Sequence, residues 1–259
     1  YDEDPVYATA LPTPTPTILT PSPKNDFQGS LAIAARNIPP SLDVHREFSP
    51  SLAALGPGIV YSRLLRLHTG PKVELPSLKV ECDLCSSWRL EGAMALEVSL
   101  RPDIHWPDVL PVNGRPLSGQ DVVASLERQR TQGWPNAAIL QGISRIISEG
   151  ETIRFELKAP NSDILLALAD GHTKILPIEF LVAPEFPAGT AVGTGPWLLA
   201  ANSNDNSFTF TRNDTYFEKH FPYLNELKVV VLEDDGIRLA AFRLGNLDVL
   251  DVPNSNWET

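Results

Sequence analysis

"SSWRLEGAMALEVSLR", at residues 86–101, is the stretch that decides the fold class. A glycine favours a turn, so the segment predicts two strands that meet at Glu91-Gly92. The second strand alternates between apolar and polar residues, as a half-buried strand does. Its expected apolar face consists of Met94, Leu96, Val98 and Leu100. Residues 86–101 therefore predict a hairpin within a β-sheet.

A helix is predicted next along the chain, over "PLSGQDVVASLERQRT" at residues 116–131. Ser118 suits the N-cap position, because its hydroxyl can accept a hydrogen bond from a free backbone N–H of the first turn. Asp121 falls in that first turn, where a carboxylate complements the positive end of the helix dipole. The apolar stripe of the helix would consist of Val122, Val123 and Leu126.

On the N-terminal side, residues 49–68 are apolar at helical spacing. Either Ser49 or Ser51 is expected to be the N-cap. Glycine and proline at residues 56–58 should interrupt the helix and leave a second helix over residues 59–67.

The remaining predicted elements complete a mixed pattern of helices and strands. The first is a strand within residues 29–43 that ends at Pro39-Pro40, and a hairpin over 143–160 that turns at Glu149-Gly150 comes later. A short helix follows over 162–170, and then strands over 207–213 and 226–233. The last is a helix over 235–252 that stops at Gly245 before a further strand. Strands and helices do not alternate regularly. The pattern favours either an α+β fold or an α/β fold with a mixed sheet.

The composition is that of an acidic globular protein. The 259-residue chain carries 21 Lys and Arg against 32 Asp and Glu, a formal net charge of −11. This charge repels nucleic-acid phosphates and anionic lipid headgroups, so nucleic acid and membrane surfaces are not expected partners. No apolar run approaches the ~20 residues of a membrane-spanning helix. The length suffices for one large domain or two small ones.

The N-terminal segment differs from the rest of the chain. "LPTPTPTILTPSP", at residues 11–23, is rich in proline and threonine, so residues 1–26 are expected to form a disordered, extended linker. Surface proteins often carry such a stalk between a membrane anchor and a domain; a tail without a role is the alternative. The chain begins at Tyr1 and shows no signal peptide, so we expect a mature or trimmed form.

"AVGTGPWLLA", at residues 191–200, has glycines that raise the question of a phosphate-binding loop. Such a loop needs a lysine after its last glycine, and this stretch has none. Pro196 also removes a backbone N–H that the loop would use as a donor. The glycines are therefore expected to allow a close backbone approach or a positive φ before a strand.

No pattern of residues supports catalysis or metal binding. Cys82 and Cys85 form a single C-x-x-C pair, which leaves open a local disulfide, two free thiols, or a redox or metal role. The five histidines lack the H-x-x-x-H spacing of a zinc site. No G-x-S-x-G nucleophile motif is present. We predict neither enzyme activity nor a cofactor nor a metal site.

Several segments in order resemble the peptide/nickel class of extracellular solute-binding proteins, family 5, which serve ABC importers. The segments are "IPPSLDVHREFSP" at 38–50, "IVYSRLLRLH" at 59–68, the stretch from 86 to 128 with its Trp-led hairpin and "DVVASLER" helix, "GTGPW" at 193–197, and the run from "FTFTRND" to "GNLDVLDV" at 208–252. The resemblance covers about residues 28–252 and lies in the order and spacing of the segments. It implies an α/β fold with a mixed sheet, the type II lobe of a periplasmic binding protein in the style of cluster C.

The chain departs from the family pattern in three ways. "WPDVLPVNG" at 106–114 is longer than the usual turn, and "CDLC" at 82–85 replaces small apolar residues. Family members are also nearly twice as long as this chain. The resemblance therefore implies that residues 27–259 form the N-terminal lobe of a two-lobe protein, with an inserted subdomain over roughly residues 45–190.

The function implied by the resemblance is capture of an extracellular solute in a cleft between two lobes. A peptide is the expected ligand; a nickel complex, a sugar or another small solute is the alternative. The ligand-binding candidates of this lobe are Asn37, Ser41, Asp43, His45 and Trp197. The expected partner is an ABC transporter permease. The expected location is extracellular, at the cell surface or in the periplasm, with a lipid anchor through the N-terminal linker.

A hypothesis from a different class remains open. The exposed face of this lobe would then be an interface, and the chain would be a structural or protein-interaction module.

Overall fold

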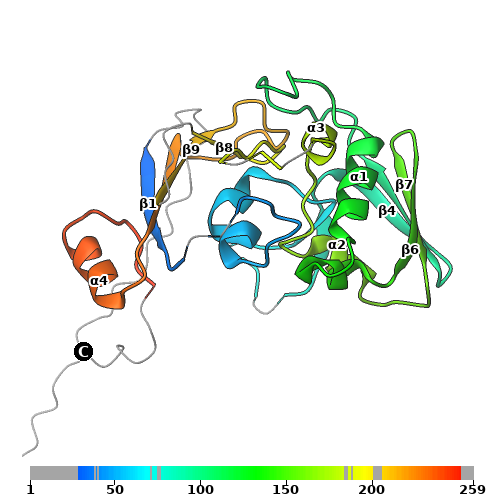
Figure 1. Ribbon diagram of the computed structural model, residues 1–259, viewed down its shortest axis with the longest axis horizontal. Helices are drawn as coiled ribbons and strands as arrows, with labels where there is room; N and C mark the ends of the chain where they lie inside the picture. The colour runs from blue at the N-terminus through cyan, green and yellow to red at the C-terminus, as the bar shows by residue number, and fades with distance from the viewer. Residues whose placement is uncertain are drawn as a thin grey trace, which may run out of the picture.

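Two four-stranded sheets lie side by side along the long axis of the molecule (Figure 1). The computed structural model describes residues 29–251, except residues 38, 40, 71, 75–76, 184–185, 188 and 201–205. The predicted linker over residues 1–26 therefore lies outside the described residues.

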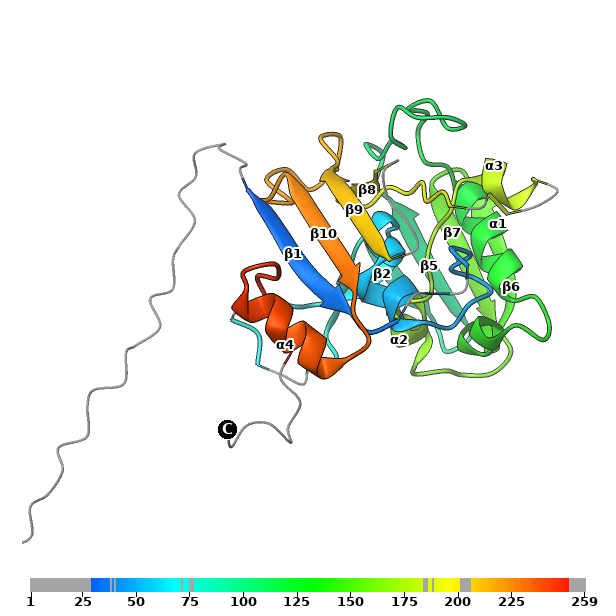
Figure 2. The same cartoon turned by 60° about the vertical axis from the view of Figure 1, so that its left-hand side comes forward.

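The main sheet has the strand order β1-β10-β9-β8. These strands are β1 (Ser30–Ala35), β10 (Glu226–Val231), β9 (Ser207–Arg212) and β8 (Trp197–Leu199). β1 runs parallel to β10, whereas the other neighbours are antiparallel, so the sheet is mixed. Figure 2 shows β1, β10 and β9 next to one another, with helix α4 (Asp235–Arg243) beyond β1.

The second sheet, here called the insert sheet, is formed entirely by residues between β1 and β8. Its antiparallel order is β4-β5-β7-β6. The strands are β4 (Cys85–Glu91), β5 (Ala95–Leu100), β7 (Thr152–Leu157) and β6 (Ile143–Glu149). The predicted hairpin turns are confirmed, with Gly92 and Gly150 both at positive φ. A small pair of strands, β2 (Leu65–Leu67) and β3 (Val80–Cys82), precedes this sheet.

Short helices cover the two sheets. They are the π-helical turn η1 (Ser51–Leu55), the 3-10 turns η2 (Pro57–Val60) and η3 (Pro135–Leu140), and the α-helices α1 (Gly119–Gln129), α2 (Ile164–Ala169) and α3 (Ile178–Leu181). Helix α1 begins as predicted. The Ser118 hydroxyl accepts from the Asp121 N–H, and the Asp121 carboxylate accepts from the Ser118 N–H. These reciprocal bonds fix the start of α1.

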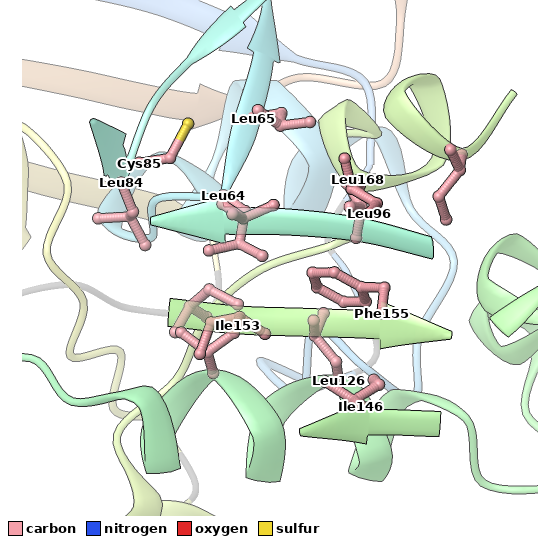
Figure 3. Close-up of a cluster of buried hydrophobic side chains, with 14 of the residues drawn as sticks. Leu64, Leu65, Leu84, Cys85, Leu96, Leu126, Ile146, Ile153, Phe155 and Leu168 are labelled. Atoms are coloured by element: carbon pink, nitrogen blue, oxygen red, sulfur yellow. The ribbon is translucent and has the colours of Figure 1, made fainter. Parts of the chain in front are cut away.

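The largest apolar core lies between the insert sheet and the helices. Leu96, Ile153 and Phe155 are fully buried, and Leu126 of α1 packs against the same cluster (Figure 3). Figure 3 shows the side chains of Ile153, Phe155, Leu126 and Ile146 converging between α1 and the strands. The predicted alternation of the second strand therefore identified the buried face of this sheet.

The predicted second helix over residues 59–67 is wrong. The turn η2 ends at Val60, and residues 65–67 form β2, in which Leu65 lies opposite Cys82 of β3. A short apolar run fits either a buried helix or a strand. Pairing with β3, a contact remote in sequence, decides between them.

Two further assignments are wrong at the level of single side chains. Neither Ser49 nor Ser51 caps η1, because Pro50 occupies the N-cap position and the Ser51 hydroxyl donates to the Asn37 carbonyl instead. Met94 is 44% exposed and lies in the turn, since β5 begins only at Ala95.

The strand expected after α4 does not form within residues 246–251. Gly245 does have the predicted positive φ, 75°. The Asp248 N–H then donates to the Ala32 carbonyl of β1 (2.8 Å), while the Asp248 carboxylate accepts from the Ala32 N–H (2.7 Å). The carboxylate takes the place of a strand carbonyl, so pairing with β1 ends after one residue.

Candidate functional site

The turn after β1 carries four of the predicted ligand-binding residues, and two of them, Asp43 and His45, are buried. Asp43 accepts two hydrogen bonds from the Arg128 guanidinium of α1, at 2.8 and 2.6 Å. Burial alone would raise the pKa of Asp43, but the hydrogen bonds and charge of Arg128 outweigh it and hold the pKa below its usual value. Asp43 is therefore an ionised group that fastens the turn to α1.

His45 is fully buried behind Asp43. Its Nε2 lies 2.9 Å from the Lys174 carbonyl oxygen, which can only accept, so Nε2 carries the proton and donates. Nδ1 then faces Arg128, 3.4 Å from Nη1. Burial and the Arg128 charge lower the pKa of His45 to about 4. The imidazole is neutral at physiological pH and supports the turn from inside.

The same turn is held by the segment around η3. The Asn136 amide donates to the carbonyls of Val44 and Glu47, at 3.0 and 2.9 Å. The Ser41 hydroxyl accepts from the Asp43 N–H. Ser41 itself is half-buried, and Asn37 is exposed. Of the four predicted residues in this turn, Asn37 and Ser41 are therefore the two whose side chains remain accessible.

Trp197 does not join this group. It opens β8, at the opposite edge of the main sheet from β1, and packs half-buried against the core of that sheet. The predicted residues thus divide into a turn after β1 and a separate position on β8.

The glycines before Trp197 allow a close approach of two backbone segments, as predicted. The Gly195 N–H donates to the Val60 carbonyl (2.8 Å). A Cβ atom at Gly195 would lie 2.6 Å from that carbonyl oxygen and 2.7 Å from the Ile59 oxygen. The Asn213 amide also donates to the Gly195 carbonyl, at 2.8 Å. The stretch before Trp197 therefore packs η2 closely against the main sheet.

Cys82 and Cys85 form a disulfide, with their Cα atoms 5.0 Å apart. The bond joins the end of β3 to the start of β4. Among the alternatives left open by the spacing, the structure has the local disulfide. Within the part of the chain that the structure describes, no three His, Cys, Asp or Glu side chains gather as metal ligands. No helix among those residues is long and apolar enough to cross a membrane.

A buried group of charges near the disulfide had no signal in the sequence. Burial, and next the charge of Arg63, lower the pKa of Lys174 to about 7, against the opposing influence of Asp83 and Asp170. The Arg63 N–H donates to the Asp83 carboxylate, at 2.9 Å. The Lys174 carbonyl is also the partner of His45. These contacts join distant segments, so local spacing could not reveal them.

A pocket of about 380 Å³ lies between the long loop that departs from the family pattern and β8. It is lined by Pro107, Val109, Leu110, Gly189, Thr190, Ala191, Val192, Leu198, Leu199 and Ala200. The unusual length of that loop was the signal available in the sequence. A second, polar pocket of about 270 Å³ lies over residues 212–221.

Comparison with known proteins gives a family match and a fold match. Residues 79–259 match the family model of bacterial extracellular solute-binding proteins, family 5 Middle. Heme-binding protein A of Haemophilus influenzae is 23% identical over 239 residues, which cover 80% of this chain and 42% of that protein. The nickel-binding periplasmic protein of Escherichia coli is 23% identical over 189 residues, covering 68% and 35%.

Two solved structures illustrate the shared fold. DppA of Helicobacter pylori, a periplasmic binding protein in complex with the peptide STSA, superposes with a TM-score of 0.75 at 23% identity, covering 90% of this chain and 48% of that one. A dipeptide-binding protein of a Pseudoalteromonas species, in complex with Met-Leu, superposes with a TM-score of 0.77 at 18% identity, covering 89% and 48%. The fold is that of periplasmic binding proteins with mixed sheets, as expected. The chain spans about half the length of these relatives or less.

Proposed function

Because the chain belongs to the bacterial extracellular solute-binding proteins of family 5, we propose that it acts in an ABC importer as part of the substrate-binding component. Its role is to capture a solute outside the cytoplasmic membrane and to deliver it to the transporter permease. The chain supplies the first of two lobes, and the solute is enclosed in the cleft between them. Membership in a family of binding proteins also sets it apart from enzymes.

A peptide is the proposed solute. Two of the similar structures are named as peptide-bound proteins. Other relatives are named for heme and nickel, so a nickel complex, a sugar or another small solute is the alternative. Asn37 and Ser41 are the proposed contacts from the turn after β1. Asp43 and His45 position that turn, and Trp197 is proposed to wall the cleft.

The observation that carries this proposal is the fastening of the insert sheet to the main sheet. The Arg128–Asp43 pair ties α1 to the turn after β1. The Ser125 hydroxyl of α1 also donates to the Leu176 carbonyl and accepts from the Leu176 N–H. A lobe that closes over a solute moves as a rigid body about a hinge. The Arg128–Asp43 bonds fasten the turn to α1, and the buried Ser125–Leu176 bonds fasten α1 to the segment before α3.

Helix α4 supports a contact with a second lobe. Its apolar side chains Ile237 and Phe242 are exposed, and Leu244 after it is 76% exposed, whereas its one buried residue is Arg238. Ile237 and Leu244, seven residues apart, lie on one side of this segment, and large apolar side chains left exposed together favour an interaction surface. The competing proposal, an interaction module, uses the same face for a different chain or a second copy. Size-exclusion chromatography with light scattering separates them, because a stable dimer through this face favours the interaction module.

The location follows from the same proposal. A disulfide persists in oxidising compartments, in agreement with an extracellular or periplasmic site. We also propose that the Pro/Thr-rich segment at residues 1–26 links the lobe to a lipid anchor.

Calorimetry of this chain with a peptide tests the need for two lobes. Half of the cleft contacts would come from the other lobe, so we expect no binding at micromolar peptide concentrations. A micromolar dissociation constant would contradict the need for a second lobe. If Asn37→Ala and Ser41→Ala also left that constant unchanged, the proposed cleft contacts would be wrong as well.

A further inference from the structure

Strand β8 leaves one edge of the main sheet without a strand partner among the described residues. On its inner side, the Asn213 N–H of the β9 segment donates to the Pro196 carbonyl, and the Ala200 N–H donates to the Thr209 carbonyl. Hydrogen-bonding residues alternate along an antiparallel strand, so Leu198 also faces β9. The main-chain groups of Trp197 and Leu199 therefore point outward, away from β9.

The pocket between the long loop and β8 lies beside this edge. Leu198, Leu199 and Ala200 form one wall, and Val109 and Leu110 of the loop form another. Leu110 is 79% exposed and Val109 40% exposed, a large exposure for apolar side chains. In both views of the molecule, β8 is the strand of the main sheet that lies nearest the insert (Figures 1 and 2).

The charge around the pocket restricts what can enter it. None of its ten lining residues is charged. The chain as a whole carries a net charge of −11, which disfavours an anionic ligand. A charged group in the pocket would lose its hydration without gaining an ionic partner. The complementary group is a neutral, apolar side chain.

We propose that the outer edge of β8 and this pocket form a binding site for an extended peptide. The peptide backbone pairs with the outward N–H and C=O groups of Leu199 and adds a strand to the main sheet. One uncharged apolar side chain of the peptide enters the pocket between Leu110 and Leu198. Main-chain bonds supply affinity and the pocket supplies selectivity, as in other cases of strand addition.

This site is separate from the proposed cleft contacts Asn37 and Ser41; of the proposed cleft residues, Trp197 alone lies on β8. Asn37 and Ser41 follow β1, whereas β8 is at the other edge of the sheet. It needs no second lobe, and it goes beyond the proposed function. A short peptide on one open edge gains few contacts, so we expect binding in the millimolar range, below the sensitivity of the calorimetric test.

The test is a titration of ¹⁵N-labelled chain, followed by NMR, with the blocked peptide acetyl-Ala-Leu-Ala-amide. We expect amide shifts at residues 198–200 and 107–110. A fully N-methylated version keeps the side chains but cannot donate main-chain bonds, so it should bind about tenfold more weakly. Acetyl-Ala-Asp-Ala-amide should bind at least tenfold more weakly as well, because the pocket offers its carboxylate no partner.

A matched pair of variants assigns the binding to the pocket. Leu110→Asp places a charge at the pocket mouth on a side chain that is already exposed, so the fold should be kept and binding should fall about tenfold. Leu78→Asp changes another exposed leucine, which is 67% exposed and lies before β3, and should leave the titration unchanged. The proposal is overturned if no shift appears at millimolar peptide, if the shifts map to residues 37–45, or if N-methylation and Leu110→Asp leave the affinity unchanged. Dimerisation through β8 that the peptide cannot displace would also overturn it, in favour of a second copy.

Discussion

The insert sheet and the main sheet differ in how completely they bury their apolar side chains. The insert sheet has a core in which Leu96, Ile153 and Phe155 are fully buried beneath α1. The main sheet has a smaller core around Phe210 and Val229, and α4 beside it leaves most of its apolar side chains exposed. The insert sheet therefore has a closed core, whereas the α4 side of the main sheet leaves apolar side chains exposed, as the proposed contact with a second lobe requires.

The largest difference should appear between two phenylalanines. Phe155→Ala removes a fully buried ring from the insert core and should lower the free energy of unfolding by roughly 3–5 kcal/mol. Phe242→Ala, on the 40% exposed ring of α4, should cost about 0.5 kcal/mol or less. Urea denaturation of both variants measures the contrast. Equal losses would mean that α4 is as well covered as the insert core.

The next effect concerns the Arg128–Asp43 pair, which connects α1 of the insert to the turn after β1 of the main sheet. Arg128→Met leaves the buried Asp43 carboxylate without its cation, so we expect a loss of about 3 kcal/mol and a separate, earlier transition of the main sheet. Far-ultraviolet circular dichroism and tryptophan fluorescence, followed together during urea denaturation, detect the separation. Arg243→Met removes an exposed arginine at the end of α4 and serves as the control. Coincident single transitions in Arg128→Met would show that the pair does not couple the regions.

Acid should also destabilise the turn after β1, through the buried imidazole of His45. The pKa of His45 is about 4 in the folded chain and about 6.5 when unfolded, so the unfolded state binds more protons between these values. The contribution of His45 to stability should be constant above pH 6.5 and should fall by up to about 2–3 kcal/mol as the pH drops from 6.5 to 4. Chemical denaturation across this range measures the slope. His45→Gln should flatten it, whereas His105→Gln, at an exposed position, should not.

The smallest effect is expected at the disulfide next to the insert. A loop closed by Cys82 and Cys85 is short, so the Cys82→Ser/Cys85→Ser variant should lose only about 2 kcal/mol on the chain-entropy model. Thermal unfolding with and without a reducing agent tests this, because reduction of the unchanged chain should reproduce the variant. A collapse of the insert sheet in the variant would show that the bond does more than close a turn.

Elements with strong local signals were predictable from the sequence. The hairpins at Gly92 and Gly150 and helix α1 depend on turn residues, alternation and an N-cap, all of which are local. Residues 65–67 were predicted as helix because their apolar spacing is ambiguous, and only pairing with β3 makes them a strand. Local signals also could not foresee that the Asp248 carboxylate would end the pairing with β1.

The candidate site was predictable in part. The turn after β1 was located correctly, but the sequence could not reveal that Arg128 and Lys174 take up the polar groups of Asp43 and His45. These partners lie 85 and 129 residues away in the sequence. The pocket at β8 was signalled only by the length of the loop at residues 106–114, since its other walls come from distant segments.

Hydrogen exchange, measured residue by residue, tests most directly whether the α4 side of the main sheet is an uncovered layer. Amides of β5 and β7 should exchange only through global unfolding, because they lie in the closed core of the insert. Amides of α4 should exchange through local opening, at least a hundredfold faster, since few of its side chains are buried. Exchange of α4 as slow as that of β5 would contradict the difference between the two regions and the proposed contact with a second lobe.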